Sequence, residues 1–171
     1  QIQQIRGLNR QARRDQARLD SLNEVLETTA ATDMLTGLGN RLALDAGLRL
    51  ARSRIERQRE SYGLLIFDLD RFKAINDKLG HLAGDEVLRA ASEALRRILR
   101  AGDSAYRYGG EEFVALILLT RPLDALAAAE RIRMAIESLQ IPNPGNPPYG
   151  HLTTSVGVAT IGPADLSADD E

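Results

Sequence analysis

The spacing of apolar residues divides the chain into a long N-terminal helix and a compact domain. Between residues 5 and 29, apolar or small side chains recur at alternating intervals of three and four, with polar residues between them: Ile5, Leu8, Ala12, Leu19, Leu22, Leu26 and Thr29. This is the spacing of a heptad seam, so residues 1–32 are predicted to form a coiled-coil linker helix. Asp15 falls on the seam and interrupts it. The alternative is a single amphipathic helix that packs on its own domain.

After residue 33, helical and strand-like patterns alternate. Helical periodicity predicts helices over residues 41–60, 72–79, 82–99 and 122–139. Short apolar runs predict strands over residues 62–67, 104–108, 113–119 and 151–161. Residues 141–150 are rich in proline, asparagine and glycine, which predicts an irregular loop. Strands interleaved with helices indicate an α/β or α+β domain with a central sheet that carries helices on its faces.

The composition is that of a folded protein without disulfides. Of the 171 residues, 43% are hydrophobic and 27% are charged, as in a globular domain. The formal net charge of −2 argues against a general affinity for nucleic acid or anionic lipid. The absence of cysteine excludes disulfides and thiolate metal sites, and no apolar run or signal peptide predicts a membrane segment. We therefore expect a cytoplasmic protein that has no nucleic-acid polymer as a partner.

Two glycines and two carboxylates stand together between the strands predicted over 104–108 and 113–119. The sequence of residues 107–113 is Arg-Tyr-Gly-Gly-Glu-Glu-Phe. A Gly-Gly pair is a natural two-residue hairpin turn, because both positions adopt φ > 0 without a Cβ clash. Taken alone, the motif is a solvated hairpin tip.

A second acidic cluster follows the apolar strand predicted over residues 62–67. The period of two along a strand places Asp68 and Asp70 on one face, with Leu69 opposite. Together with the hairpin carboxylates they form a cluster of like charges, which is costly unless a cation neutralises it. The ligands are hard oxygens with no His or Cys nearby in sequence, so Mg²⁺ or Mn²⁺ is favoured over zinc. This chemistry indicates metal-assisted phosphoryl or nucleotidyl transfer.

The segment after the second cluster adds polar side chains near the predicted phosphate site. Lys73 is followed by Asn76, by His81 and by Asp85. Taken singly, Asn76 and Asp85 are ordinary turn or cap residues. Together they offer an amide and a carboxylate, and a carboxylate accepts from the ring N–H and the exocyclic amine of guanine.

The motifs, taken together, resemble the GGDEF domain, the diguanylate cyclase family. The stretches that carry the resemblance are residues 67–85 and 107–113, with the opening motif Asp-Met-Leu-Thr-Gly-Leu-Gly-Asn-Arg at 33–41 and Thr-Ser-Val-Gly-Val-Ala at 154–159. The resemblance covers residues 33–161 and implies a palm-like α/β fold shared with nucleotidyl cyclases. It also implies synthesis of cyclic di-GMP from two GTP molecules, with release of pyrophosphate.

The resemblance implies the following roles at the metal and the reacting phosphate. Mg²⁺, or Mn²⁺ in its place, would be held by Asp68, the carbonyl of Leu69 and Glu111. Glu111 or its neighbour Glu112 would assist deprotonation of the attacking ribose 3′-OH. Lys73 would stabilise the transferring phosphate.

Further residues of the motif would contact the nucleotide. Gly109 and Gly110 would let the hairpin approach GTP closely. Asn76, His81 and Asp85 would contact GTP, chiefly its guanine. Each such domain holds one GTP, so two domains must face each other in a homodimer, which we expect to form through the N-terminal coiled coil.

A regulatory site is also implied. Arg100 and Asp103 occupy the position of the family's Arg-x-x-Asp product-inhibition site, and Arg131 matches the usual secondary arginine on the following helix. A guanidinium against guanine and phosphate suits a guanine dinucleotide. An arginine at a helix end with a capping aspartate is the alternative interpretation.

The family usually continues with a helix of the kind Ala-Asp-x-Ala-Leu-Tyr-x-Ala-Lys and then Gly-Arg-Asn. The printed sequence stops before such a segment, so we expect a catalytic domain over residues 33–171 without its C-terminal helix and strand. The leading hypothesis is an active cyclase domain that is covalently linked to an upstream sensor. The alternatives are a catalytically idle GGDEF module that acts as a cyclic di-GMP receptor or GTP sensor, and a pure dimerisation adaptor.

Overall fold

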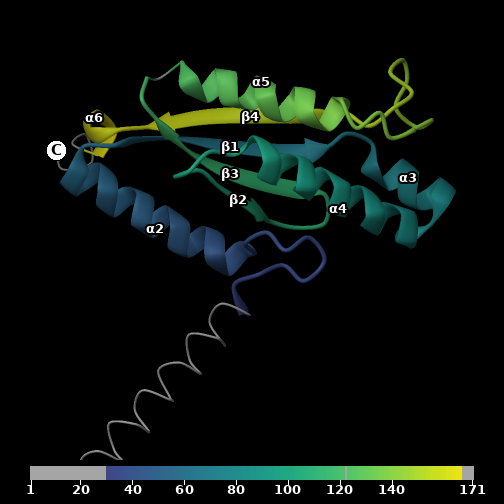
Figure 1. Cartoon of the computed structure of the whole chain (residues 1–171), viewed down its shortest axis with the longest axis horizontal. Helices are drawn as coiled ribbons and strands as arrows, with labels where there is room; N and C mark the ends of the chain where they lie inside the picture. Colours follow the sequence, from purple (N-terminus) through teal and green to yellow (C-terminus); the bar gives the residue numbers. More distant parts are fainter. Residues whose placement is uncertain (1–29, 122, 167–171) are drawn as a thin grey trace, which may run out of the picture. The chain divides into compact units, whose positions relative to one another are not determined.

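The computed structural model describes residues 30–121 and 123–166 of the chain, coloured along the sequence in Figure 1. Its helices are α2 (Arg41–Gln58), α3 (Phe72–Leu79), α4 (His81–Ile98), α5 (Asp124–Glu137) and α6 (Pro163–Leu166). Its strands are β1 (Ser61–Leu69), β2 (Ser104–Arg107), β3 (Glu112–Leu119) and β4 (Thr154–Ile161). The predicted coiled coil lies outside the described residues.

The strands form one antiparallel sheet with the order β2-β3-β1-β4. The two inner strands, β1 and β3, are therefore paired on both edges. Their sequences are almost continuously apolar because side chains on both faces of these strands are buried against helices. The register places Asp68 opposite Glu112 on β3 and opposite Ser155 on β4. The predicted central sheet with flanking helices is confirmed, and every pairing in it is antiparallel.

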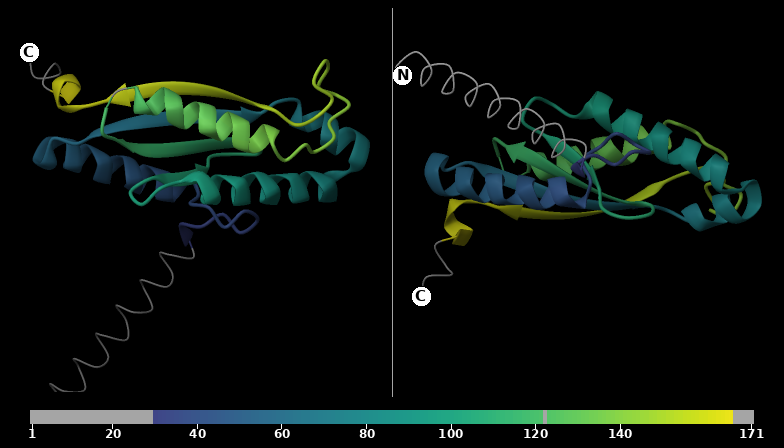
Figure 2. Two further views of the ribbon diagram at one scale, coloured as in Figure 1. Left: turned by 45° about the horizontal axis from the view of Figure 1, so that its top comes forward. Right: turned by 90° about the horizontal axis from the view of Figure 1, so that it is seen from below.

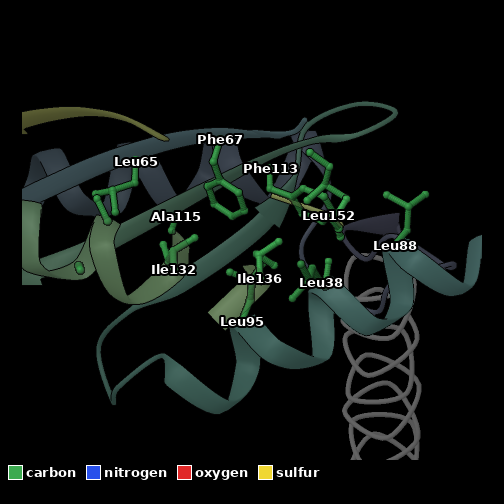
Figure 3. Close-up of a cluster of buried hydrophobic side chains, with 14 of the residues drawn as sticks. Leu38, Leu65, Phe67, Leu88, Leu95, Phe113, Ala115, Ile132, Ile136 and Leu152 are labelled. Atoms are coloured by element: carbon green, nitrogen blue, oxygen red, sulfur yellow. The ribbon is translucent and has the colours of Figure 1, made fainter. Parts of the chain in front are cut away.

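Alternate residues of β1 and β3 face opposite helices, because successive side chains on a strand point to opposite faces. On one face, Phe67 and Phe113 stack with their ring centroids 5.5 Å apart and pack against α4 and α5. Figure 3 shows them pointing towards Ile132 and Ile136 of α5, with Leu95 of α4 alongside. On the other face, Val114 and its neighbours pack against Leu44 of α2. Figure 2 shows these helices on the two sides of the sheet.

The predicted elements are found, with shifts at their ends. β1 extends to Leu69 rather than Phe67, because Asp68 and Leu69 continue the ladder with β4. α5 begins at Asp124 rather than at residue 122, and the Asp124 carboxylate accepts from the backbone N–H of Arg121 at 2.9 Å. His151 lies outside β4, in an isolated bridge to Pro142. None of the described helices has the length and apolar character needed to cross a bilayer.

The hairpin between β2 and β3 is longer than a two-residue turn. Arg107 pairs with Phe113, and the N–H groups of Tyr108 and Gly109 donate to the carbonyl of Glu112. Neither Gly109 nor Gly110 has a left-handed φ, so the expected tight turn with φ > 0 at both glycines is wrong. A Cβ at Gly110 would meet no atom within 4 Å. The missing side chain of Gly110 therefore leaves open space beside the backbone, whereas a Cβ at Gly109 would lie 3.3 Å from Glu112 Oε2.

Candidate active site

The acidic residues of the two motifs meet at one end of the inner strands. Asp68, near the end of β1, lies directly opposite Glu112, the first residue of β3, so that their side chains share one face of the sheet. The backbone N–H of Leu69 donates to the carbonyl of Glu111 at 3.4 Å. The structure thus brings Asp68, Leu69, Glu111 and Glu112 together, although they are more than forty residues apart in the sequence.

Burial and neighbouring negative charges raise the pKa of two carboxylates at this end, Asp68 and Glu111. Burial raises the pKa of Asp68 above its usual value, and the charges of Glu112 and Asp70 raise it further. Burial likewise raises the pKa of Glu111, with Asp68 and Glu112 adding to the effect. Across the described residues, neither Asp68 nor Glu111 is stabilised by a hydrogen-bond donor. The ionised forms of these two carboxylates are therefore disfavoured in the folded protein, and a bound cation would stabilise them.

The donor set fits a hard divalent cation that is shared with a ligand. Throughout residues 30–121 and 123–166, no group of three or more His, Cys, Asp or Glu side chains is arranged as a complete metal site. Mg²⁺ is commonly held by only one or two carboxylates and completes its shell with substrate phosphates and water. The oxygens of Asp68 and Glu111 meet that requirement, and with no nitrogen or sulfur donor among them they do not favour zinc.

Asp70 differs from Asp68 in its surroundings. Its Oδ1 accepts from Ser155 Oγ at 2.7 Å and its Oδ2 accepts from Thr153 Oγ1 at 2.6 Å. Its backbone N–H donates to the carbonyl of Thr153 at 3.0 Å. The negative charge of Asp70 still acts on Asp68, but its oxygens are occupied. Asp70 therefore links the end of β1 to the start of β4, and unlike Asp68 it has both carboxylate oxygens bonded within the fold.

The residues expected to contact a nucleotide lie on α3 and at the start of α4. Lys73 is the second residue of α3 and His81 is the first residue of α4, and both are exposed. Asp85 is half-buried in the next turn of α4. Asn76 faces the same turn, because a Cβ at Gly84 would overlap its Oδ1. That oxygen is buried and accepts no hydrogen bond from the described residues.

One arginine, which the sequence pattern did not single out as a site residue, holds the hairpin. Arg107 donates through Nε and Nη2 to the carbonyl of Gly110, at 3.1 and 2.8 Å. Its Nη1 lies 3.2 Å from Asp33 Oδ1, in an ion pair whose side chains are only 16% and 22% exposed. Burial acts to raise the pKa of Asp33, but hydrogen bonds from Thr36 and Arg107 outweigh it and lower that pKa.

A hollow of about 450 Å³ lies beside the hairpin. Its lining combines the hairpin with the segment that leads into α2: Asp33, Asn40, Arg41, Leu42, Arg107, Tyr108, Gly109 and Gly110. Arg41 lies over the Tyr108 ring, 5.0 Å from its centroid. Gly109 and Gly110 are the lining residues that the sequence singled out as site residues, and the acidic cluster does not line this hollow.

The predicted product-inhibition residues lie apart from the acidic cluster. The Asp103 carboxylate accepts from the backbone N–H of Arg100 at 3.0 Å and from that of Leu118 at 3.1 Å, so it fixes the turn before β2. The Arg100 side chain is exposed, and Arg131 is half-buried on α5. Neither guanidinium forms an ion pair with another described residue.

The fold and the acidic cluster define a palm domain of the nucleotidyl-cyclase kind, and comparisons with known proteins agree. Residues 30–170 match the family model of the diguanylate cyclase GGDEF domain. The chain is 43% identical over 139 residues to the diguanylate cyclase DgcM of Escherichia coli K12, covering 81% of this chain and 32% of DgcM. It is 41% identical over 147 residues to the response regulator PleD of Caulobacter vibrioides, covering 85% of this chain and 32% of PleD.

Solved structures give the same result. The coiled coil and GGDEF domain of DgcB from Caulobacter crescentus, solved in complex with c-di-GMP, superposes with a TM-score of 0.73 at 31% identity, covering 92% of this chain and 84% of that one. The diguanylate cyclase SiaD of Pseudomonas aeruginosa, solved with its activator SiaC, gives 0.71 at 33% identity, covering 99% and 65%. The chain belongs to the GGDEF domain family. It spans about a third of the length of the curated relatives described above.

Proposed function

We propose that this chain is a diguanylate cyclase domain, which condenses two GTP molecules into cyclic di-GMP and releases two pyrophosphates. The observation that carries the proposal is the meeting of Asp68 with Glu111 and Glu112 at the end of the inner strands. A cluster of carboxylates without donors is costly, and a metal-bound triphosphate is the kind of ligand that offsets this cost. The relatives named diguanylate cyclases support the reaction class.

The metal-binding residues would be Asp68, Glu111 and the backbone carbonyl of Leu69. Mg²⁺, or Mn²⁺ in its place, supplies charge neutralisation for the phosphate oxygens when it is bound. The oxygens of Asp68 and Glu111 are available as metal ligands because no hydrogen-bond donor among the described residues occupies them. Lys73 extends from the exposed start of α3, where its ammonium would stabilise charge on the transferring phosphate.

The bond-making step needs a base and a second nucleotide. The ribose 3′-OH of one GTP attacks the α-phosphate of the other, and its proton passes to Glu111 or Glu112 as pyrophosphate leaves. Glu112 is exposed at the start of β3, where a nucleotide held by a second copy of the domain would reach it. Catalysis then depends largely on the positioning of two bound reactants. We further propose that residues 1–32 would pair two copies of the domain and would link them to a sensor that controls their encounter.

Guanine would bind beside α3 and α4. Among the described residues the Asn76 oxygen has no hydrogen-bond donor, and the N–H groups of a guanine would supply one once the side chain turns outward. Asp85 would accept from the same base edge, and His81, the exposed first residue of α4, would lie beside the nucleotide. Gly109 and Gly110 would let the hairpin backbone approach the nucleotide, and the space beside Gly110 is open in the fold.

Product inhibition is proposed at Arg100, Asp103 and Arg131. Asp103 fixes the turn that presents the exposed Arg100 side chain. A guanidinium in this position would pair with the phosphate or the guanine of cyclic di-GMP. An Arg100→Ala variant should then keep its initial rate and lose inhibition by added product. Equal inhibition of the variant and the wild-type protein would contradict this assignment.

The experiment that tests the activity is incubation of the protein with GTP and Mg²⁺, followed by chromatography for cyclic di-GMP and pyrophosphate. Asp68→Asn should abolish product, whereas Asp45→Asn should match the wild-type protein because Asp45 is an exposed residue of α2. Absence of product from the full-length wild-type protein would contradict the proposal. Binding of cyclic di-GMP without turnover would instead favour the receptor alternative.

A further inference from the structure

The turn between β1 and α3 has an unfavourable backbone conformation. Arg71 lies in the left-handed region, with φ 56° and ψ 30°. L-residues with a Cβ avoid this region because the side chain approaches the following carbonyl. Arg71 also occupies the N-cap position of α3 without a side-chain capping hydrogen bond. Such a conformation persists only where the surrounding structure enforces it.

A buried asparagine from the distant 141–150 loop supplies contacts that enforce this turn. Asn143 is fully buried and its Nδ2 donates to the carbonyls of Asp70 and Arg71, at 3.2 and 3.4 Å. Its Oδ1 accepts from the backbone N–H of Gly145 at 3.2 Å. Both ends of the amide are therefore used, and the reverse orientation would place the oxygen against two carbonyl oxygens. The amide orientation is thus fixed by its partners.

The loop that carries Asn143 is itself anchored. The backbone N–H of Asn143 donates to the carbonyl of Gly150 at 2.9 Å, and Asn146 Nδ2 donates to Thr153 Oγ1 at 2.9 Å. Gly145 packs so closely on α3 that a Cβ there would clash with the side chain of Ala74. The loop is therefore held by its own hydrogen bonds and packs against α3 beside the turn.

We propose that Asn143 is a positioning residue for the nucleotide site, acting through the two carbonyls of the β1–α3 turn. The proposal rests on the proposed function, because the turn joins Leu69, whose carbonyl is assigned to the metal, to Lys73, which is assigned to the phosphate. Asn143 touches neither group. It holds the backbone of Asp70 and Arg71, which lie between them, and a displacement of about 1 Å at a reacting centre costs roughly a hundredfold in rate.

The test compares Asn143→Ala with Asn146→Ala. Asn146 is a matched control, because it is an asparagine of the same loop and is 7% exposed, but it donates to His151 and Thr153 rather than to the turn. Thr153 keeps its own proton for Asp70 when Asn146 is removed. Two measurements are made well below the unfolding temperature of each variant. The first is amide exchange of Asp70 and Ala74 without ligand, and the second is the affinity for 3′-deoxyGTP with Mg²⁺.

Asn143→Ala should speed exchange of the Ala74 amide, which donates to the Arg71 carbonyl at 2.9 Å, and should weaken 3′-deoxyGTP binding about tenfold. Asn146→Ala should stay within about twofold of the wild-type protein in both measurements. Equal changes in the two variants, or wild-type behaviour of Asn143→Ala, would overturn the proposal. Should Asn143→Ala fail to fold, Asn143→Ser enters the same comparison with the same expected ranking.

A second arm uses the backbone preference of glycine. Glycine adopts the left-handed conformation freely, so Arg71→Gly should reduce the loss of unfolding stability caused by Asn143→Ala. Strictly additive effects of the two substitutions would count against the proposal. Because exchange and unfolding need no nucleotide, these measurements judge Asn143 even if the wild-type protein makes no cyclic di-GMP.

Discussion

Two aspartates at the end of β1 have the same side chain and opposite surroundings. Asp68 lies among other carboxylates, and its pKa is raised by burial and by their charge. Asp70, two residues further on, has both carboxylate oxygens bonded to the hydroxyls of Thr153 and Ser155. The structure thus satisfies one carboxylate internally and leaves the other to an external partner. An unsatisfied charge at a site is typical of binding or catalysis, whereas a satisfied one is typical of support.

The largest effect is expected from the unsatisfied carboxylate. Asp68→Asn should lower cyclic di-GMP production by at least about a thousandfold, because it removes a charged metal ligand. Stability should change in the other direction. A raised folded-state pKa means that the folded protein loses stability as pH rises from the unfolded pKa through the folded one. At pH 7 the variant should therefore unfold about 1–3 °C higher than the wild-type protein.

Both effects are measured on protein freed of co-purified nucleotide. Cyclic di-GMP production is assayed with added GTP and Mg²⁺, and thermal unfolding is recorded without them. The control is Asp45→Asn, which removes an exposed aspartate of α2 and should change neither quantity. A fall in unfolding temperature for Asp68→Asn would show that this carboxylate is stabilised by the fold, and the contrast with Asp70 would then be wrong.

The next largest effect is expected at Asp70, where substitution should lower stability instead of raising it. Asp70→Ala removes the acceptor for two hydroxyls and leaves Thr153 Oγ1 largely buried without it. We expect a loss of about 2 kcal/mol in unfolding free energy, or roughly 5 °C, and a rate about tenfold lower because the adjoining turn loosens. Ser155→Ala, which removes one exposed donor, should cost less than half as much. Chemical unfolding of the three proteins measures this, and an Asp70→Ala protein as stable as wild-type would contradict it.

The contrast between the aspartates was only half visible in the sequence. The apolar run before Asp68 and the Gly-Gly-Glu-Glu stretch predicted both strands and their acidic ends, because strand period and composition are local signals. The partners of Asp70 are more than eighty residues away in the sequence. They reach Asp70 through the pairing of β1 with β4, a long-range contact that local sequence patterns do not predict. Asn143 stands in a segment whose prolines and glycine predict only a loop. At the glycine hairpin the local pattern predicted too much, because Gly109 and Gly110 suit a tight turn with positive φ that the structure does not form.

A smaller effect is expected at the hairpin that carries the acidic residues. Arg107→Lys keeps the charge towards Asp33 but loses the forked donation to the Gly110 carbonyl. The hairpin should then sample more positions, and the rate should fall about three- to tenfold with little change in unfolding temperature. Steady-state kinetics should place most of this loss in kcat. Arg52→Lys, in an exposed pair with Glu56 on α2, is the matched control and should be silent.

The smallest effect extends the comparison to a third carboxylate. Asp33 resembles Asp70 in being satisfied, since hydrogen bonds from Thr36 and Arg107 lower its pKa from the ordinary 3.8 despite its burial. A lowered folded-state pKa contributes stability that is present above the unfolded pKa and is lost as pH falls through the folded value. Asp33→Asn should therefore cost about 1 kcal/mol at pH 7, and this difference should shrink as the pH falls below 4. Urea unfolding from pH 7 to pH 3.5 measures it, with Asp45→Asn as the exposed control. If the stability difference between the wild-type protein and Asp33→Asn instead grew as the pH fell, the pKa of Asp33 would be raised in the folded state. Asp33 would then belong with Asp68 among the carboxylates that the fold does not stabilise.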